Sequence, residues 1–113
     1  DGKLATFSNY GATSVDIAAP GVSILSTVPG ASYASLNGTS MAAPHVSGIA
    51  ALIAAANPGL DATVLKARIL EAGTSTPELF GRVASGRRAP VPTAATRRCA
   101  GAKRPARSTR RQC

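Results

Sequence analysis

The residue best placed for chemistry is a serine that follows a glycine-containing turn. Ser40 comes directly after Asn37-Gly38-Thr39 and stands at the start of a long Ala-rich apolar segment, residues 41–56. The length and Ala content of that segment predict a helix, so Ser40 lies at the positive end of a helix dipole. There a serine hydroxyl can act as a nucleophile, and unpaired N–H groups of the first turn can stabilise an oxyanion. The alternative for Ser40 is an ordinary helix cap, which is the commoner role of a serine in this position.

The other polar residues near this segment are better explained by structure than by chemistry. His45 lies about one helical turn beyond Ser40, and we interpret it as a structural helix histidine rather than a ligand. Met41 is interpreted as a packing residue, Asp16 as a polar group at a strand end and Asp61 as a helix cap. The two Cys residues have no metal-ligand spacing, and we expect neither a metal nor a cofactor.

Strands and a central helix must position Ser40. Two short runs rich in Val and Ile, residues 15–19 and 22–28, end at Pro-Gly pairs, which predicts strands. Residues 41–56 are apolar on nearly every side, which predicts a helix that is buried all round, with Thr39 and Ser40 as its caps. The polar stretch 33–40 shows neither pattern.

A second, amphipathic helix is predicted from Asp61 or Ala62 to Ala72. Asp61 is its expected cap, Leu65 and Ile69 form an apolar pair one turn apart, and Gly73 ends it. Its apolar face needs a partner, and the central helix is the expected one. Strands and helices in this order predict the α/β class.

Charge divides the chain at Gly86. The 113 residues carry a formal net charge of +8, but residues 1–86 have four basic and five acidic groups, whereas residues 87–113 have nine basic groups and no acid. Apolar periodicity also disappears beyond Gly86, which predicts a disordered basic tail over 87–113. Such a tail predicts nonspecific, salt-sensitive adhesion to nucleic acid.

Several classes of protein are not expected. The longest apolar segment, 41–56, contains Pro44, His45 and Ser47 and is too short for a membrane span, so no membrane contact is expected. The chain begins without Met or a visible leader, and we interpret it as a piece of something longer. Cys99 and Cys113 both lie in the basic tail and provide no disulfide framework for the apolar part.

Nine consecutive residues from Gly38 to Val46 resemble the nucleophile motif of the subtilisin-like serine proteases, the subtilases. The resemblance covers about residues 7–86, because segments 7–11, 15–21, 50–52 and 57–58 also resemble the family in the same order. It implies the C-terminal part of a three-layer α/β catalytic domain, with strands, a long buried central helix and a second amphipathic helix. The expected organisation is a partial peptidase domain over 1–86 followed by the basic tail over 87–113.

The resemblance implies a serine endopeptidase in which Ser40 is the nucleophile and its backbone N–H forms part of the oxyanion hole. In the family, a His takes the proton from this Ser, and a buried Asp orients the His. His45 and Asp16 match neither residue, and the motifs of the catalytic Asp and His are absent from this chain. The chain is therefore expected to be inactive alone. Its implied partners are a polypeptide substrate and the missing N-terminal part of the domain, and secretion is implied by the family.

Two alternatives stay open. The chain could be a non-catalytic basic nucleic-acid-binding protein that acts through its tail, or an inactive remnant of a protease. After Gly86 the family commonly continues with Gly, Arg and an aliphatic-Asn-Ala helix, whereas this chain continues with Arg87-Arg88-Ala89-Pro90. We therefore hypothesise that residues 87–113 are out of frame.

Overall fold

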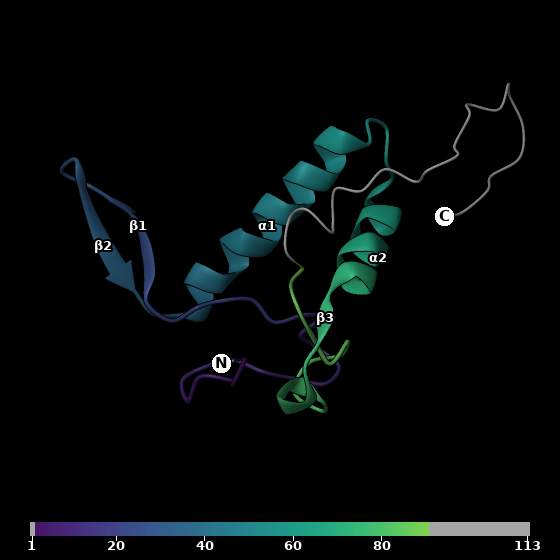
Figure 1. Ribbon diagram of the computed structural model, residues 1–113, viewed down its shortest axis with the longest axis horizontal. Coiled ribbons are helices and arrows are strands. Elements are labelled where there is room, and N and C mark those ends of the chain that lie inside the picture. Colours follow the sequence, from purple (N-terminus) through teal and green to yellow (C-terminus); the bar gives the residue numbers. More distant parts are fainter. Residues whose placement is uncertain (1, 91–113) are drawn as a thin grey trace, which may run out of the picture.

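The structure is a computed structural model that describes residues 2–90. It is a mixed α/β fragment in which two helices lie side by side and a β-hairpin projects away from them (Figure 1). The elements, in chain order, are β1 (Ile24–Val28), β2 (Ser32–Leu36), α1 (Thr39–Ala56), α2 (Ala62–Ala72), β3 (Thr74–Ser75), the short 3₁₀ helix η1 (Pro77–Leu79) and β4 (Arg87–Arg88).

The core lies between the two helices. Ile49 and Ile53 of α1 pack against Ile69 of α2, and Ile53 is completely buried. Burying an aliphatic side chain of this size contributes about 1.5–3 kcal/mol. The Asp61 carboxylate accepts a hydrogen bond from the backbone N–H of Thr63 at 2.8 Å and so caps α2. The predicted second helix, its cap and its packing partner are therefore confirmed.

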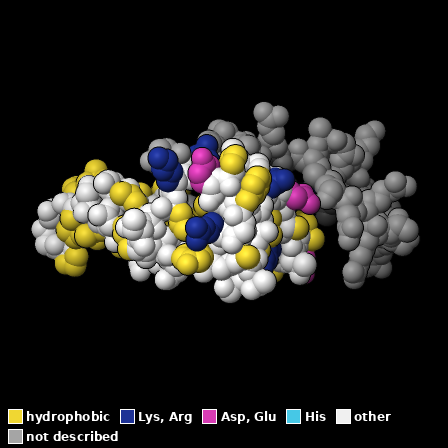
Figure 2. Space-filling view, turned by 90° about the horizontal axis from the view of Figure 1, so that it is seen from below, with side chains coloured by type: hydrophobic (Ala, Val, Ile, Leu, Met, Phe, Trp, Pro, Cys, Tyr) yellow, Lys and Arg dark blue, Asp and Glu magenta, His cyan; other side chains and the backbone are white. Residues whose placement is uncertain are grey.

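The hairpin leads the chain to Ser40. β1 pairs antiparallel with β2, with Ile24 opposite Leu36. The predicted strand over 22–28 is confirmed from Ile24 onward, but β2 lies in a stretch that gave no strand pattern. Its Ser and Ala residues provide no apolar alternation, and pairing with β1 determines its conformation. Leu25 and Tyr33 are largely exposed, and hydrophobic side chains gather on this projecting lobe (Figure 2).

The expectations for the central helix need two corrections. Gly38, rather than Thr39 or Ser40, is the N-cap of α1, and among the described residues no side chain caps the helix. Of the α1 residues, only Ile49 and Ile53 are buried, so the expectation of burial all round is wrong for the described part of this chain. Burial of an apolar helix on all sides requires packing partners on every side. Here α2 packs against one side of α1.

The expected strand over 15–19 is also wrong in extent. Within this segment, only Ala18 forms a bridge, parallel to Arg88. Its neighbour β4 has just two residues, which limits the pairing. Asp16 forms an ion pair with Lys66 of α2 at 2.8 Å, and both side chains are more than half exposed.

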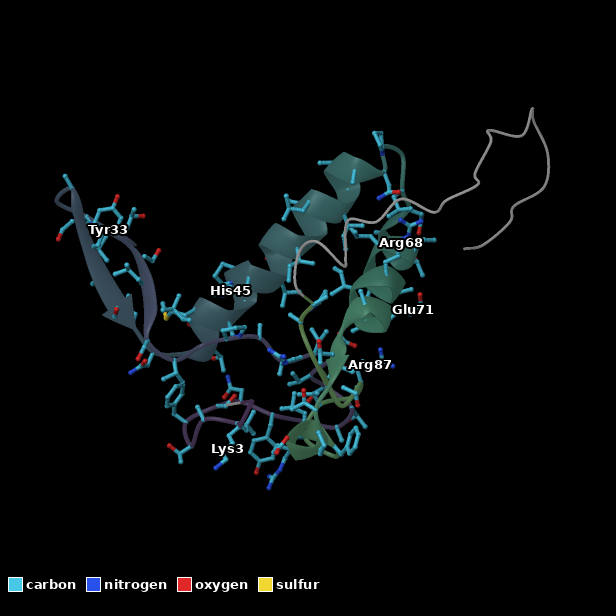
Figure 3. All side chains as sticks on the ribbon, viewed as in Figure 1. Lys3, Tyr33, His45, Arg68, Glu71 and Arg87 are labelled. Atoms are coloured by element: carbon cyan, nitrogen blue, oxygen red, sulfur yellow. The ribbon has the colours of Figure 1, made fainter. Side chains whose placement is uncertain are left out.

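β4 lies within the segment that the sequence assigned to the basic tail. Arg88 pairs with Thr74 of β3, and the Arg87 guanidinium donates hydrogen bonds to the carbonyl oxygens of Glu71 at 2.7 Å and Gly73 at 3.2 Å (Figure 3). A cation is favourable there because it faces the C-terminal end of the α2 dipole. The expected disorder therefore does not hold for these two residues. The rest of the predicted tail from residue 91, including both Cys residues, lies outside the described residues.

Candidate active site

Ser40 is the second residue of α1 and its side chain is exposed. Within residues 2–90, neither its hydroxyl nor its backbone N–H has a hydrogen-bond partner. The N–H of the next residue, Met41, donates to the Gly38 carbonyl at 3.0 Å. Because no side chain caps α1, the N–H of Ser40 points out of an uncapped helix end and can bind a negative charge.

The turn before Ser40 depends on two glycines. Gly38 has φ 154° and ψ 160°, a conformation that other residues rarely adopt. Its N–H donates to the Gly21 carbonyl at 2.8 Å, and a Cβ at Gly21 would lie 2.7 Å from the Gly38 oxygen. A side chain at position 21 would therefore push the turn away from the loop that supports it.

Two asparagine side chains also hold this turn. The N–H of Ser23 donates to Asn37 Oδ1 at 2.6 Å, and Asn9 Nδ2 donates to Thr39 Oγ1 at 3.4 Å. Neither asparagine was expected from the sequence to belong to the site. Asn37 could have been found because it directly precedes the glycine of the motif. Asn9 could not be found from local sequence, because its contact joins residues 30 positions apart.

His45 does not serve Ser40. Its Nδ1 lies 2.9 Å from the Met41 carbonyl oxygen in the preceding turn, which requires that Nδ1 carry the hydrogen. The imidazole is exposed on α1 (Figure 3), and no hydrogen bond joins it to Ser40 in the described part of the chain. The structural interpretation of His45 agrees with this geometry. Met41 is half-buried, in keeping with a packing role.

A cavity of about 540 Å³ lies beside the N-terminal half of α1. Thr39, Ala42, Ala43 and Val46 of α1 line it, together with segments before Asn37 and with Leu79, Val83, Arg88 and Ala89. Its lining includes no Asp, Glu or His and does not include Ser40. Among the described residues, no three His, Cys, Asp or Glu side chains are grouped so that they could hold a metal ion. Within residues 2–90, no carboxylate or imidazole is hydrogen-bonded to Ser40.

The composition of α1 alone does not distinguish a core helix from a membrane span. The helix has 18 residues and a mean hydropathy of 1.3, enough by length and composition to cross a bilayer, so the expectation that it is too short for a span is wrong. A core helix of a water-soluble domain reaches the same values, so this is weak evidence for a membrane.

Comparison with known proteins shows the family to which the chain belongs. A family model described as the subtilase family matches residues 1–96. The chain is 67% identical over 54 residues to alkaline elastase YaB from Bacillus sp. strain YaB, a match that covers 48% of this chain and 14% of that protein. It is 52% identical over 71 residues to subtilisin BL from Lederbergia lenta, covering 63% of this chain and 26% of that protein.

Solved structures agree with the sequence matches. The A-subunit of the AB5 toxin from E. coli superposes with a TM-score of 0.71 at 38% identity, over 77% of this chain and 28% of that chain. The chain thus spans about a quarter or less of each sequence relative described above and just over a quarter of the toxin subunit. Because the family model covers most of its length, the chain belongs to the subtilase family of serine endopeptidases.

Proposed function

We propose that this chain carries the nucleophile of a subtilisin-like serine endopeptidase and that Ser40 hydrolyses peptide bonds when the rest of the catalytic domain is present. The observation that carries the proposal is the exposed Ser40 at the uncapped N-terminus of α1, within a nine-residue match to the motif of the family. This position provides both a nucleophile and a donor for the oxyanion.

The reaction begins when Ser40 Oγ attacks the carbonyl carbon of the scissile peptide bond. A His from the rest of the domain takes the hydroxyl proton, and the N–H of Ser40 donates a hydrogen bond to the carbonyl oxygen as it becomes negative. The tetrahedral species collapses, the same His gives the proton to the leaving amine, and water then hydrolyses the acyl-enzyme. His45 is not this base, because its Nδ1–H donates to the carbonyl of Met41 in its own helix and, within residues 2–90, no hydrogen bond joins its ring to Ser40.

The missing part of the domain is the first partner that this function requires. Leu52 lies on α1 and is 47% exposed, although apolar side chains of this size are usually buried in a core helix. The chain spans 26% of the length of subtilisin BL, so most of a domain is left to cover that side. We infer that α1 becomes the central helix of a three-layer domain when this part is present. Secretion, which the family resemblance implies, belongs to the same proposal.

A hybrid protease tests the function. In this hybrid, the corresponding residues of this chain replace the matching stretch of subtilisin BL. These residues are named by their numbers in this chain. We expect a fluorophosphonate probe to label Ser40 in the hybrid and to leave the 113-residue chain unlabelled. Ser40→Ala should lower peptide hydrolysis by the hybrid on the order of a millionfold, since a triad without its nucleophile retains only background catalysis.

A hybrid that unfolds cooperatively on heating but is not labelled at Ser40 would contradict the proposal. Rapid labelling of the 113-residue chain would contradict the claim that its base is missing. Alkaline elastase YaB, at 67% identity, provides a second scaffold for the same exchange should the first not fold.

A further inference from the structure

The helix that carries Ser40 begins in a way that should leave it loose. Gly38 is its N-cap, no side chain caps it, and a glycine at this position adds backbone freedom. Uncapped helix ends fray through their first turn, which is where Ser40 lies. A nucleophile, by contrast, must be held in a fixed position, because a misplacement of about 1 Å can cost on the order of a hundredfold in rate.

The contacts around the turn supply the rigidity that the cap does not. We propose that Asn37 and Asn9 are positioning residues for Ser40, acting from either side of the Gly38 turn; this inference rests on the proposed function. Asn37 Oδ1 accepts the Ser23 N–H at 2.6 Å, and Asn9 Nδ2 reaches Thr39 Oγ1 at 3.4 Å. Together with the backbone bond from Gly38 to Gly21, these contacts fix each of the three residues that precede Ser40.

The choice of partners explains why asparagines outside the helix hold the turn. A conventional cap at position 38 would accept hydrogen bonds from the N–H groups of Ser40 or Met41. A cap that bound the Ser40 N–H would occupy the donor that the oxyanion needs. Asn37 and Asn9 bond instead to Ser23 and Thr39 Oγ1, and within residues 2–90 the N–H of Ser40 stays unpaired. The arrangement holds the nucleophile while leaving its oxyanion donor available.

Asn37 has the stronger effect because it also closes the base of the hairpin. Ser23 directly precedes β1 and Asn37 directly follows β2, so their bond joins the two open ends of the hairpin. Ser23 has φ 54°, a left-handed conformation that is unfavourable for a non-glycine residue and that persists only where contacts impose it. Without the Asn37 contact, the loop and the turn can relax independently, and Ser40 moves with the turn.

Substitutions in the hybrid protease test this role. Asn37→Ala should lower kcat and the rate constant of fluorophosphonate labelling about 10- to 100-fold, with little change in KM. The matched control is Asn57→Ala at the other end of α1, where the side chain donates to the Ile53 carbonyl at 3.0 Å. It removes one side-chain hydrogen bond from the same helix and should lower the melting temperature while leaving kcat unchanged.

Asn37→Asp keeps an accepting oxygen at the same place and should restore most of kcat, measured on the pH plateau of the reaction. A normal kcat in Asn37→Ala, or an equal loss in Asn57→Ala, would overturn the positioning role while the activity of the parent hybrid still supports the proposed function. If Asn37→Ala prevents folding, Asn9→Ala decides the question. We expect it to lower kcat severalfold, and an unchanged kcat would overturn the proposal.

Discussion

The two ends of α1 are held by different forces. At the C-terminal end, Ile53 is completely buried against α2, and Asn57 closes the helix with side-chain and backbone bonds. At the N-terminal end, Ser40 is exposed and Gly38 provides no side-chain cap. The turn is held by the hydrogen bond that Asn37 accepts and the one that Asn9 donates. One end combines apolar packing with the hydrogen bonds of Asn57, and the other is held by a few polar contacts without such packing.

This difference follows from what each end must do. Packing excludes water and fills space, so it suits a helix end that has no contact with substrate. A nucleophile must stay accessible, and its neighbouring N–H must stay unpaired to receive an oxyanion. Directional hydrogen bonds from outside the first turn can fix such a residue without covering it. Stability and catalysis should therefore respond to substitutions at opposite ends of the same helix.

The largest effect on stability is expected at the buried end. Ile53→Ala should lower the free energy of unfolding by about 2–5 kcal/mol, because it leaves a cavity between the helices. Urea unfolding of the Ser40→Ala hybrid, which cannot digest itself, measures this loss. In the active hybrid, kcat per folded molecule should not change.

Leu52→Ala is the matched variant on the uncovered side of α1. In the isolated chain, where Leu52 is 47% exposed, it should change the helical circular dichroism signal little. In the hybrid it should cost about 2–5 kcal/mol, because the rest of the domain covers this side. An equally small effect in both settings would contradict the proposal that α1 becomes a central helix.

The sequence predicted local features well and contacts between distant residues poorly. α2 and its Asp61 cap were predictable because an amphipathic period and a capping residue are local signals. Ser40 was placed at a helix N-terminus by the same local logic. The Asn9 contact and the pairing of β2 join residues that are distant in sequence or lack an apolar period, so no local pattern announced them. The burial of α1 was overestimated because its composition shows only that every side of the helix is apolar. Composition does not show whether other segments pack against each of those sides.

An intermediate effect is expected from Gly38→Ala at the catalytic end. A Cβ at Gly38 meets no atom closer than 3.5 Å, so the cost arises from its φ of 154° and should be about 1–3 kcal/mol. The turn relieves this strain by moving, which should lower kcat more than stability. Gly59→Ala is the control, since Gly59 also has a positive φ, lies in open space and follows the other end of α1. Equal losses of kcat in the two variants, measured in the hybrid, would show that strain near Ser40 has no special effect.

The smallest effect is expected from the ion pair between Lys66 and Asp16. Its atoms are 2.8 Å apart, but both side chains are more than half exposed, so water screens the attraction. Lys66→Met should cost less than about 1 kcal/mol and the difference from the parent should fade at about 1 M salt, measured by urea unfolding of the Ser40→Ala hybrid. A larger, salt-independent loss would mean that polar contacts also hold the α2 side of the molecule. The contrast would then be weaker, because a polar contact would contribute as much to the α2 side as apolar packing does.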